Sequence, residues 1–197
     1  MKRLLSSFML VLFCCLQPLR ADTTLKTDVL LKAVVFIYSP NSDGTEADTT
    51  KPIGTGFLVL ARSKGAAAQG IVILITARHI VDPWWATCSA EPQQQPDRRI
   101  FLRVNKTNYD PKKDATGVDY EPLDLVRNGV KRYSVSGDSQ VDAAIVDAVS
   151  FDRAMQQKYD FAPLELASLA SADEIAKFKI GDSIASPGLV PGRSGEM

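Results

Sequence analysis

His79 is the only histidine in a chain of 197 residues, and it stands just past an apolar run at residues 71–75 that reads Ile-Val-Ile-Leu-Ile. A continuous run of β-branched residues is typical of a strand buried on both faces. We therefore expect His79 at the point where this strand leaves the core. Histidine exchanges a proton readily near neutral pH, which is the chemistry of a general base. An ordinary loop histidine would leave the same local pattern.

Asp142 is the second candidate, because it stands at the head of another apolar run, Ala143-Ala-Ile-Val. Such a position would hold the carboxylate partly buried, and an ionised carboxylate there needs a partner. The available partner is an imidazole N–H, which the acid would orient and whose charged form it would stabilise. The sequence therefore predicts that Asp142 contacts His79, although 63 positions separate them.

Several short strands are expected to position these two side chains. Residues 54–60 predict a strand that forms a hairpin with the histidine strand through the connection at 64–70. Further strands are expected at 32–38, 100–104, 133–135 and 142–149, joined by polar, turn-rich segments. Short strands connected in this way favour an all-β antiparallel barrel.

Three segments, Gly54-Thr-Gly-Phe, Ile75-Thr-Ala-Arg-His79 and Asp142-Ala-Ala-Ile, together resemble the trypsin-like serine peptidase superfamily in its bacterial secreted branch. The second is the more specific, since the base of that family stands in Leu-Val-Thr-Ala-x-His-Val or its isoleucine form. Arg78 occupies the variable position, where many members carry a small residue. The resemblance implies that His79 is the catalytic base, that Asp142 fixes its tautomer, and that a serine attacks the peptide bond.

The third residue of such a triad, the serine nucleophile, cannot be clearly identified in the sequence. In the family it lies in a Gly-x-Ser-Gly loop followed by a small residue and proline, and Gly192-Arg-Ser194-Gly195 matches only the first four positions before Glu196 and Met197. A nucleophile needs a rigid turn with backbone N–H donors aimed at the oxyanion. We therefore interpret Ser194 as a surface-loop residue and expect the nucleophile beyond Met197. On this interpretation the chain is an inactive fragment of an active serine endopeptidase.

The resemblance implies a double-barrel fold in which the first barrel is complete and the second is partial. The predicted organisation is a signal peptide at 1–21, a first β-barrel carrying base and acid at 22–150, and a linker with an incomplete second barrel at 151–197. Leu164 is expected to begin the new unit, and a strand is expected at 181–185. Ser171 and Glu174 have the spacing of a capping box, which predicts a short helix up to Phe178.

The first 21 residues have the composition of a signal peptide. Lys2 and Arg3 precede an apolar stretch at 8–16, and Ala21 ends a usable cleavage site. The stretch is too short to span a bilayer, so the mature protein is expected to be secreted or periplasmic. A lipoprotein interpretation of Cys14 and Cys15 is disfavoured because the residue before each is not small. Cleavage would leave Cys88 alone, which we expect to be a partly buried small hydrophobe.

Net charge and composition exclude several classes of binding partner. Removing the three basic residues of the leader leaves 20 basic and 23 acidic residues, a net charge of −3, which does not attract nucleic acid or an anionic membrane. No phosphate-binding loop and no histidine or cysteine pair at metal-ligand spacing occurs, so neither a cofactor nor a metal is expected. The expected partner is a protein or peptide substrate. The oligomeric state is not encoded in any recognisable pattern.

Two alternatives belong to other functional classes. The first is a catalytically dead, protease-like binding module of the cell envelope, in which His79 and Asp142 are relics and no Gly-x-Ser-Gly loop follows. The second is a secreted structural or adhesion barrel without protease ancestry, which predicts that His79 and Asp142 lie far apart.

Overall fold

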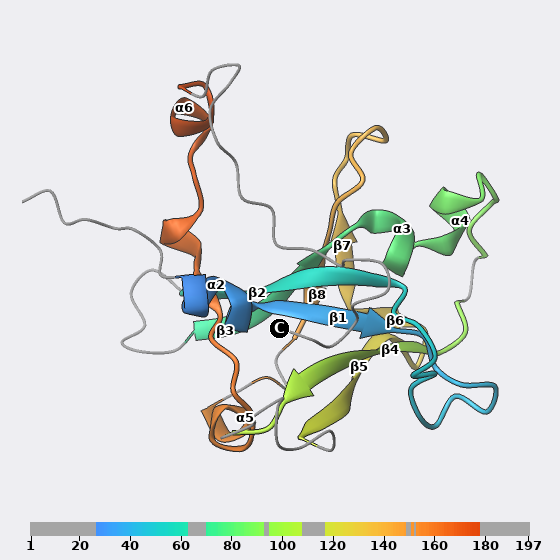
Figure 1. The fold of residues 1–197 in the computed structure, drawn as a ribbon. Coiled ribbons are helices and arrows are strands. Elements are labelled where there is room, and N and C mark those ends of the chain that lie inside the picture. The colour runs from blue at the N-terminus through green and yellow to red at the C-terminus, as the bar shows by residue number, and fades with distance from the viewer. Residues whose placement is uncertain are drawn as a thin grey trace, which may run out of the picture.

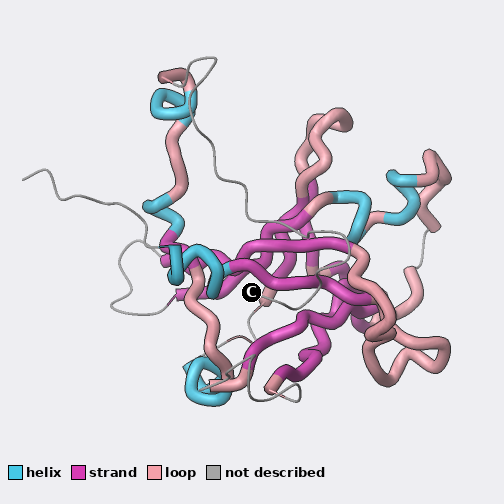
Figure 2. The backbone as a smooth tube through the Cα atoms, viewed as in Figure 1, coloured by secondary structure: helices cyan, strands magenta, loops and turns pink. Residues whose placement is uncertain are grey.

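The computed structural model describes residues 27–62, 70–92, 95–107, 117–148, 151 and 153–177. These residues build one predominantly antiparallel β-sheet that curls into a nearly closed barrel (Figures 1 and 2). The prediction of an all-β barrel is confirmed. The predicted signal peptide, the strand expected at 181–185 and Ser194 all lie outside the described residues.

Nine strands and six short helical segments make up the described chain. The strands are β1 (Val34–Tyr38), β2 (Gly54–Arg62), β3 (Gly70–Thr76), β4 (Arg98–Asn105), β5 (Val118–Arg127), β6 (Val130–Lys131), β7 (Tyr133–Val135), β8 (Ala144–Asp147) and β9 (Leu164–Glu165). The helices are α2 (Thr27–Ala33), α3 (Arg78–Val81), α4 (Pro83–Ala86), α5 (Arg153–Lys158) and α6 (Ala172–Ile175), with a 3₁₀ turn, η1, at Leu166–Ser168. The strands follow the order β6-β5-β4-β1-β2-β3-β8-β7 around the barrel.

A single residue joins the two ends of this strand order. Arg132 lies between β6 and β7; its backbone N–H donates to the Leu125 carbonyl of β5, and its carbonyl accepts from the backbone N–H of Asp147 in β8, both at 2.9 Å. The stretch that contains β6 and β7 therefore bridges both edges of the sheet. Closing a sheet in this way leaves few strand edges open to pairing with other chains.

The barrel interior is filled by apolar side chains from every other position of the strands. Ile37, Leu58, Leu74, Leu102 and Val146 are all 0% exposed. Because side chains alternate across a strand, each of these residues is flanked by neighbours that face outward. This alternation gives the molecule one main core inside the wall.

The histidine strand β3 differs from the prediction that it is buried on both faces. Val72 and Leu74 are buried, whereas Ile71 is 55% exposed and Ile73 and Ile75 are half-buried. The strand forms part of a barrel wall, and only its inner face lies in the main core. Ile73 and Ile75 pack outside the barrel against a small second cluster that includes Leu164.

Gly56 in β2 is required by the close approach of β3. A Cβ atom at this position would lie 2.6 Å from Leu74 Cδ1 and 2.9 Å from the Ile75 carbonyl oxygen. Neither distance is tolerable, and the second involves backbone that cannot move aside. The second glycine of the Gly54-Thr-Gly-Phe segment therefore allows the hairpin that carries the histidine to pack tightly.

Phe151 and residues 153–165 pack on the barrel, whereas the sequence had placed them in a linker and an incomplete second barrel. Phe151, Tyr159 and Phe161 are 0%, 1% and 8% exposed and belong to the main core. Leu164 does not begin a new unit, because β9 pairs in parallel with β2 through Val59 and Leu164. A parallel pairing needs a long returning connection, and α5 lies on that connection.

Hydrogen bonds of the Tyr159 hydroxyl also attach this segment to β5. The Tyr159 hydroxyl lies 2.7 Å from Asp119 Oδ2 and is in hydrogen-bond contact with Glu121. Burial first, and then the hydrogen bond with Glu121, raise the pKa of Tyr159 above its ordinary value, so the hydroxyl keeps its proton. Lys158 contacts the same Glu121 carboxylate at 3.2 Å.

The capping box at the beginning of α6 is confirmed. The backbone N–H of Glu174 donates to Ser171 Oγ at 3.3 Å, and Glu174 Oε2 accepts from the backbone N–H of Ser171 at 2.7 Å. The backbone N–H groups of Ser171 and Glu174, which have no partner within the helix, thereby gain hydrogen-bond acceptors. The helix ends at Ile175, before the predicted Phe178, which lies outside the described residues.

Candidate active site

His79 lies on α3, a single helical turn that begins two residues after β3 ends at Thr76. Two buried residues anchor this turn on either side of the histidine. Thr76 is 6% exposed and donates its hydroxyl to the Thr55 carbonyl of β2 at 2.8 Å, and Val81 is 0% exposed. The imidazole is therefore carried by backbone that is fixed to the barrel at both ends.

Asp142 reaches His79 because of the pairing between β3 and β8. The last pair of that antiparallel ladder joins Thr76 to Ala144. Since the two chains run in opposite directions, continuing the register by two residues on each strand brings Asp142 opposite Arg78, next to His79. Hydrogen bonding between two strands thus brings together residues that are far apart in the sequence.

Both carboxylate oxygens of Asp142 bind His79. Oδ2 lies 2.8 Å from the ring nitrogen Nδ1, and Oδ1 accepts the backbone N–H of His79 at 3.0 Å. An ionised carboxylate only accepts hydrogen bonds, so Nδ1 carries a proton, and in a neutral imidazole the lone pair then lies on Nε2. The side chains of His79 and Asp142 are 50% and 42% exposed respectively, so Asp142 is exposed and the expectation that its carboxylate is semi-buried was wrong.

Hydrogen bonding keeps the Asp142 carboxyl ionised. The backbone N–H of His79, followed by the hydrogen bond with the imidazole, lowers the pKa of Asp142 below its ordinary value. At neutral pH the carboxylate is therefore available to hold the Nδ1–H tautomer. The arrangement leaves Nε2 free to accept a proton from a nucleophile.

The lowered pKa of Asp142 predicts a pH-dependent contribution to stability. A group whose pKa is lower in the folded state stabilises the fold at pH values above its unfolded pKa, near 4 for aspartate. This contribution is lost as the pH falls through the folded pKa. We expect the difference in unfolding free energy between wild type and Asp142→Asn to shrink as the pH falls below about 4. Urea unfolding at several pH values measures it, and a difference unchanged down to pH 2 would contradict the assignment.

No side-chain hydroxyl hydrogen-bonds to Nε2 of His79 among the described residues. Ser194, the only serine that the sequence placed in a nucleophile-like motif, lies outside them. The described part of the chain also holds no group of three metal-binding side chains. What it does provide is an imidazole in hydrogen-bond contact with a carboxylate, the kind of pair that can activate a hydroxyl group brought to it.

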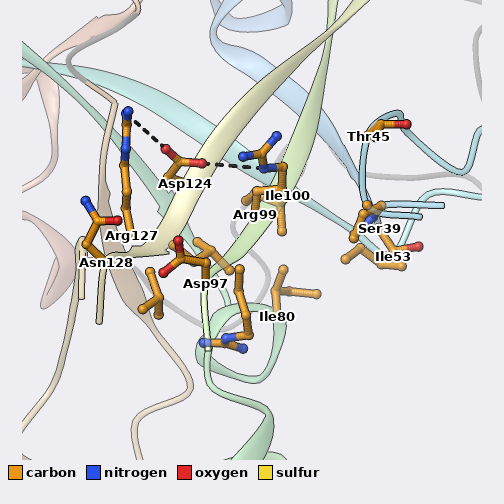
Figure 3. Close-up of a pocket in the computed structure, with 15 residues that line it drawn as sticks. Ser39, Thr45, Ile53, Ile80, Asp97, Arg99, Ile100, Asp124, Arg127 and Asn128 are labelled. Carbon is orange, nitrogen blue, oxygen red and sulfur yellow. Dashed lines mark ion pairs between the residues drawn. The ribbon is translucent and has the colours of Figure 1, made fainter. Parts of the chain in front are cut away.

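A hollow of about 770 Å³ lies beside α3 but does not include the candidate pair (Figure 3). Ile80 lines it from α3, and most of the remaining wall comes from β4, β5 and residues 39–45, with Ile53, Asp97 and Asn128 beside them. Its charged groups pair with one another, since Arg99 and Arg127 each approach Asp124 to 3.5 Å. Asp124 is therefore already paired with two arginines, and the contact between His79 and Asp142 lies outside this hollow.

A second hollow, of about 760 Å³, does not include His79 or Asp142 either, but it is lined by Arg78, the neighbour of His79. Arg78, Trp84 and Trp85 line one side and Ser139 and Gln140 the other. Trp85 contacts the loop that carries Asp142, because its indole N–H donates to the Ser139 carbonyl, and sequence reasoning missed this contact. The available signal was Asp82-Pro83, an N-cap residue followed by proline at the first helical position, which marks the start of α4.

Cys88 is exposed, contrary to the expected partial burial. It follows α4 in a turn where residues 86–92 are all exposed, and its φ of 52° is unusual for a residue other than glycine. The adjacent tryptophans do not cover it, because they point toward Arg78 and Arg98 instead.

Comparisons with family models, curated proteins and solved structures returned no match to this chain. Within the described residues, no helix has the length and apolar character needed to cross a membrane.

Proposed function

We propose that this chain belongs to a trypsin-like serine endopeptidase in which His79 is the general base and Asp142 is the acid that orients it. The observation that carries the proposal is the two-point contact of Asp142 with both the ring and the backbone of His79, at 2.8 and 3.0 Å. This contact supports the proposal because it selects the one imidazole tautomer that can accept a proton at Nε2. The likeness of the sequence motifs adds independent support.

The proposed reaction transfers an acyl group first to a serine and then to water. As the serine oxygen attacks the peptide carbonyl carbon, its proton passes to Nε2 of His79, and the imidazolium then protonates the leaving amine. Water repeats the sequence and releases the acyl group. Asp142 remains ionised throughout and stabilises the imidazolium. The serine is supplied from outside the described residues, and the substrate is a protein or peptide met in the periplasm or outside the cell.

The structural-barrel alternative predicted a wide separation of His79 and Asp142, and the 2.8 Å contact counts against it. The dead binding module differs from the peptidase only in lacking a nucleophile. A reagent that reacts with activated serines therefore separates these two functions.

The test uses a fluorophosphonate probe on the secreted full-length gene product. We expect stoichiometric labelling of one serine, identified by peptide mapping, and at least a 10³-fold slower reaction in the His79→Ala variant, because the triad acts as a unit. Pre-denatured protein serves as the blank for non-specific reaction. Absence of labelling in the folded wild type would refute the peptidase and favour the binding module. Labelling that persists at the wild-type rate in His79→Ala would refute the role of His79.

A further inference from the structure

We infer that Trp85 is a positioning residue for Asp142, acting through its indole N–H on the loop that carries the acid. Trp85 Nε1 donates to the Ser139 backbone carbonyl at 3.1 Å, three residues before Asp142. This inference rests on the proposed roles of His79 and Asp142.

The loop between β7 and β8 needs an external anchor. Asp142 lies before the first residue of β8, and residues 137–143 are all exposed. Within the loop, Val141 N–H donates to the Asp138 carbonyl and Gln140 N–H to the Asp138 side chain. These bonds shape the loop but do not attach it to the barrel. An exposed segment with few buried contacts opens readily, and an orienting acid must not move relative to its base.

Trp85 is itself held firmly in place. Asp82, only 7% exposed, accepts the backbone N–H of Trp85 at 3.1 Å and pairs with Arg78 Nε at 3.1 Å. The Arg78 guanidinium lies 5.0 Å from the centre of the Trp85 ring, in the range of a cation–π contact. Arg78 and Asp82 therefore fix both the backbone and the ring of Trp85.

These contacts connect His79 to Asp142 by a second route, separate from their direct hydrogen bonds. Arg78 is the neighbour of His79, and it connects through Asp82 and Trp85 to Ser139, whose loop leads to Asp142. In Figure 1, α3, α4 and the loop between β7 and β8 project from the same side of the barrel. The base and the acid are thus joined directly by their own hydrogen bonds and a second time by the indole N–H.

Replacing Trp85 by phenylalanine tests this role, because it keeps an aromatic ring for Arg78 but removes the N–H donor. The chain has one histidine, so ¹⁵N-histidine labelling of the full chain gives a single imidazole to follow by NMR. We expect the Nδ1 proton of His79 to exchange with solvent about 2- to 10-fold faster in Trp85→Phe, the factor that corresponds to one ordinary hydrogen bond. The backbone amide protons of residues 137–143 should also exchange faster with solvent in this variant.

The matched control is Trp84→Phe, since Trp84 is the adjacent tryptophan and packs on Arg98 at 4.6 Å. We expect no change in His79 exchange for this variant. Replacing Trp85 by β-(3-benzothienyl)alanine, which substitutes sulfur for the N–H in a ring of the same shape, should reproduce the effect of phenylalanine without repacking. That variant also serves if Trp85→Phe does not fold.

Wild-type exchange at His79 in the benzothienyl variant would overturn the inference. So would faster exchange spread evenly over the barrel, because that pattern indicates general destabilisation rather than release of one loop. Neither result bears on the peptidase proposal, which stands or falls on fluorophosphonate labelling of the wild type.

Discussion

On the proposed function, Asp142→Asn is expected to reduce peptide hydrolysis by the full-length protein about 10⁴-fold, with little change in substrate binding. The asparagine amide has nearly the shape of the carboxylate but is neutral, and its NH₂ group can donate to Nδ1. The imidazole proton then moves to Nε2, which can no longer accept the proton of a serine. The loss is therefore one of tautomer and charge stabilisation rather than of folding.

The tautomer can be measured in the same variant. The ¹⁵N shifts of the single histidine distinguish Nδ1–H from Nε2–H, and we expect the population to move to Nε2–H in Asp142→Asn. Asp147→Asn is the control, because Asp147 lies on β8 and its side chain is 41% exposed, as against 42% for Asp142. Turnover of Asp142→Asn within tenfold of wild type would show that Asp142 is not the orienting acid.

Phe151→Ala is expected to lower the free energy of unfolding by about 3–5 kcal/mol. Phe151 is 0% exposed and packs edge-to-face on Phe161 with ring centres 5.5 Å apart. Truncation removes a large buried ring, and the surrounding sheet cannot collapse to fill the space. Urea unfolding of the full chain, followed by tryptophan fluorescence, provides the measurement.

Ile175→Ala is the control for Phe151→Ala, because Ile175 is 58% exposed on α6. A substitution at so exposed a site usually changes stability by less than about 0.5 kcal/mol. A loss below about 1 kcal/mol for Phe151→Ala would mean that residues after 150 are not part of the barrel core. A large loss would show that the barrel core includes Phe151, beyond the predicted boundary at residue 150.

Several strands and the candidate residues could be predicted because their signals are local, whereas β5 and β6 were missed. Alternating or continuous apolar runs predicted β1 to β4 and β8, and the Ser171–Glu174 spacing predicted the capping box of α6. His79 stood out as the only histidine, beyond an apolar run, and Asp142 as an acid at the head of another. Each of these signals is contained within a few neighbouring residues.

Other features depend on contacts across the fold and leave no such local signal. The two-residue strand β9 is too short to have a periodicity, and only its parallel pairing with β2 shows that the chain returns to the first sheet. The exposure of Cys88 follows from where α4 projects from the barrel. The contact between Trp85 and Ser139 likewise joins α4 to the loop between β7 and β8, and nothing in the sequence of either segment indicates that they meet.

The amino-acid sequence alone determined the barrel class and the identity of the two residues suited to base and acid, because side-chain chemistry and strand periodicity are properties of short segments. Only the tertiary structure decided that Asp142 contacts both the ring and the backbone of His79, and that Phe151 and residues 153–165 pack on the barrel. Both outcomes depend on strand pairing, β3 with β8 in one case and β2 with β9 in the other. Strand pairing is set by hydrogen bonds and side-chain packing between distant segments, so it exists only once the chain has folded.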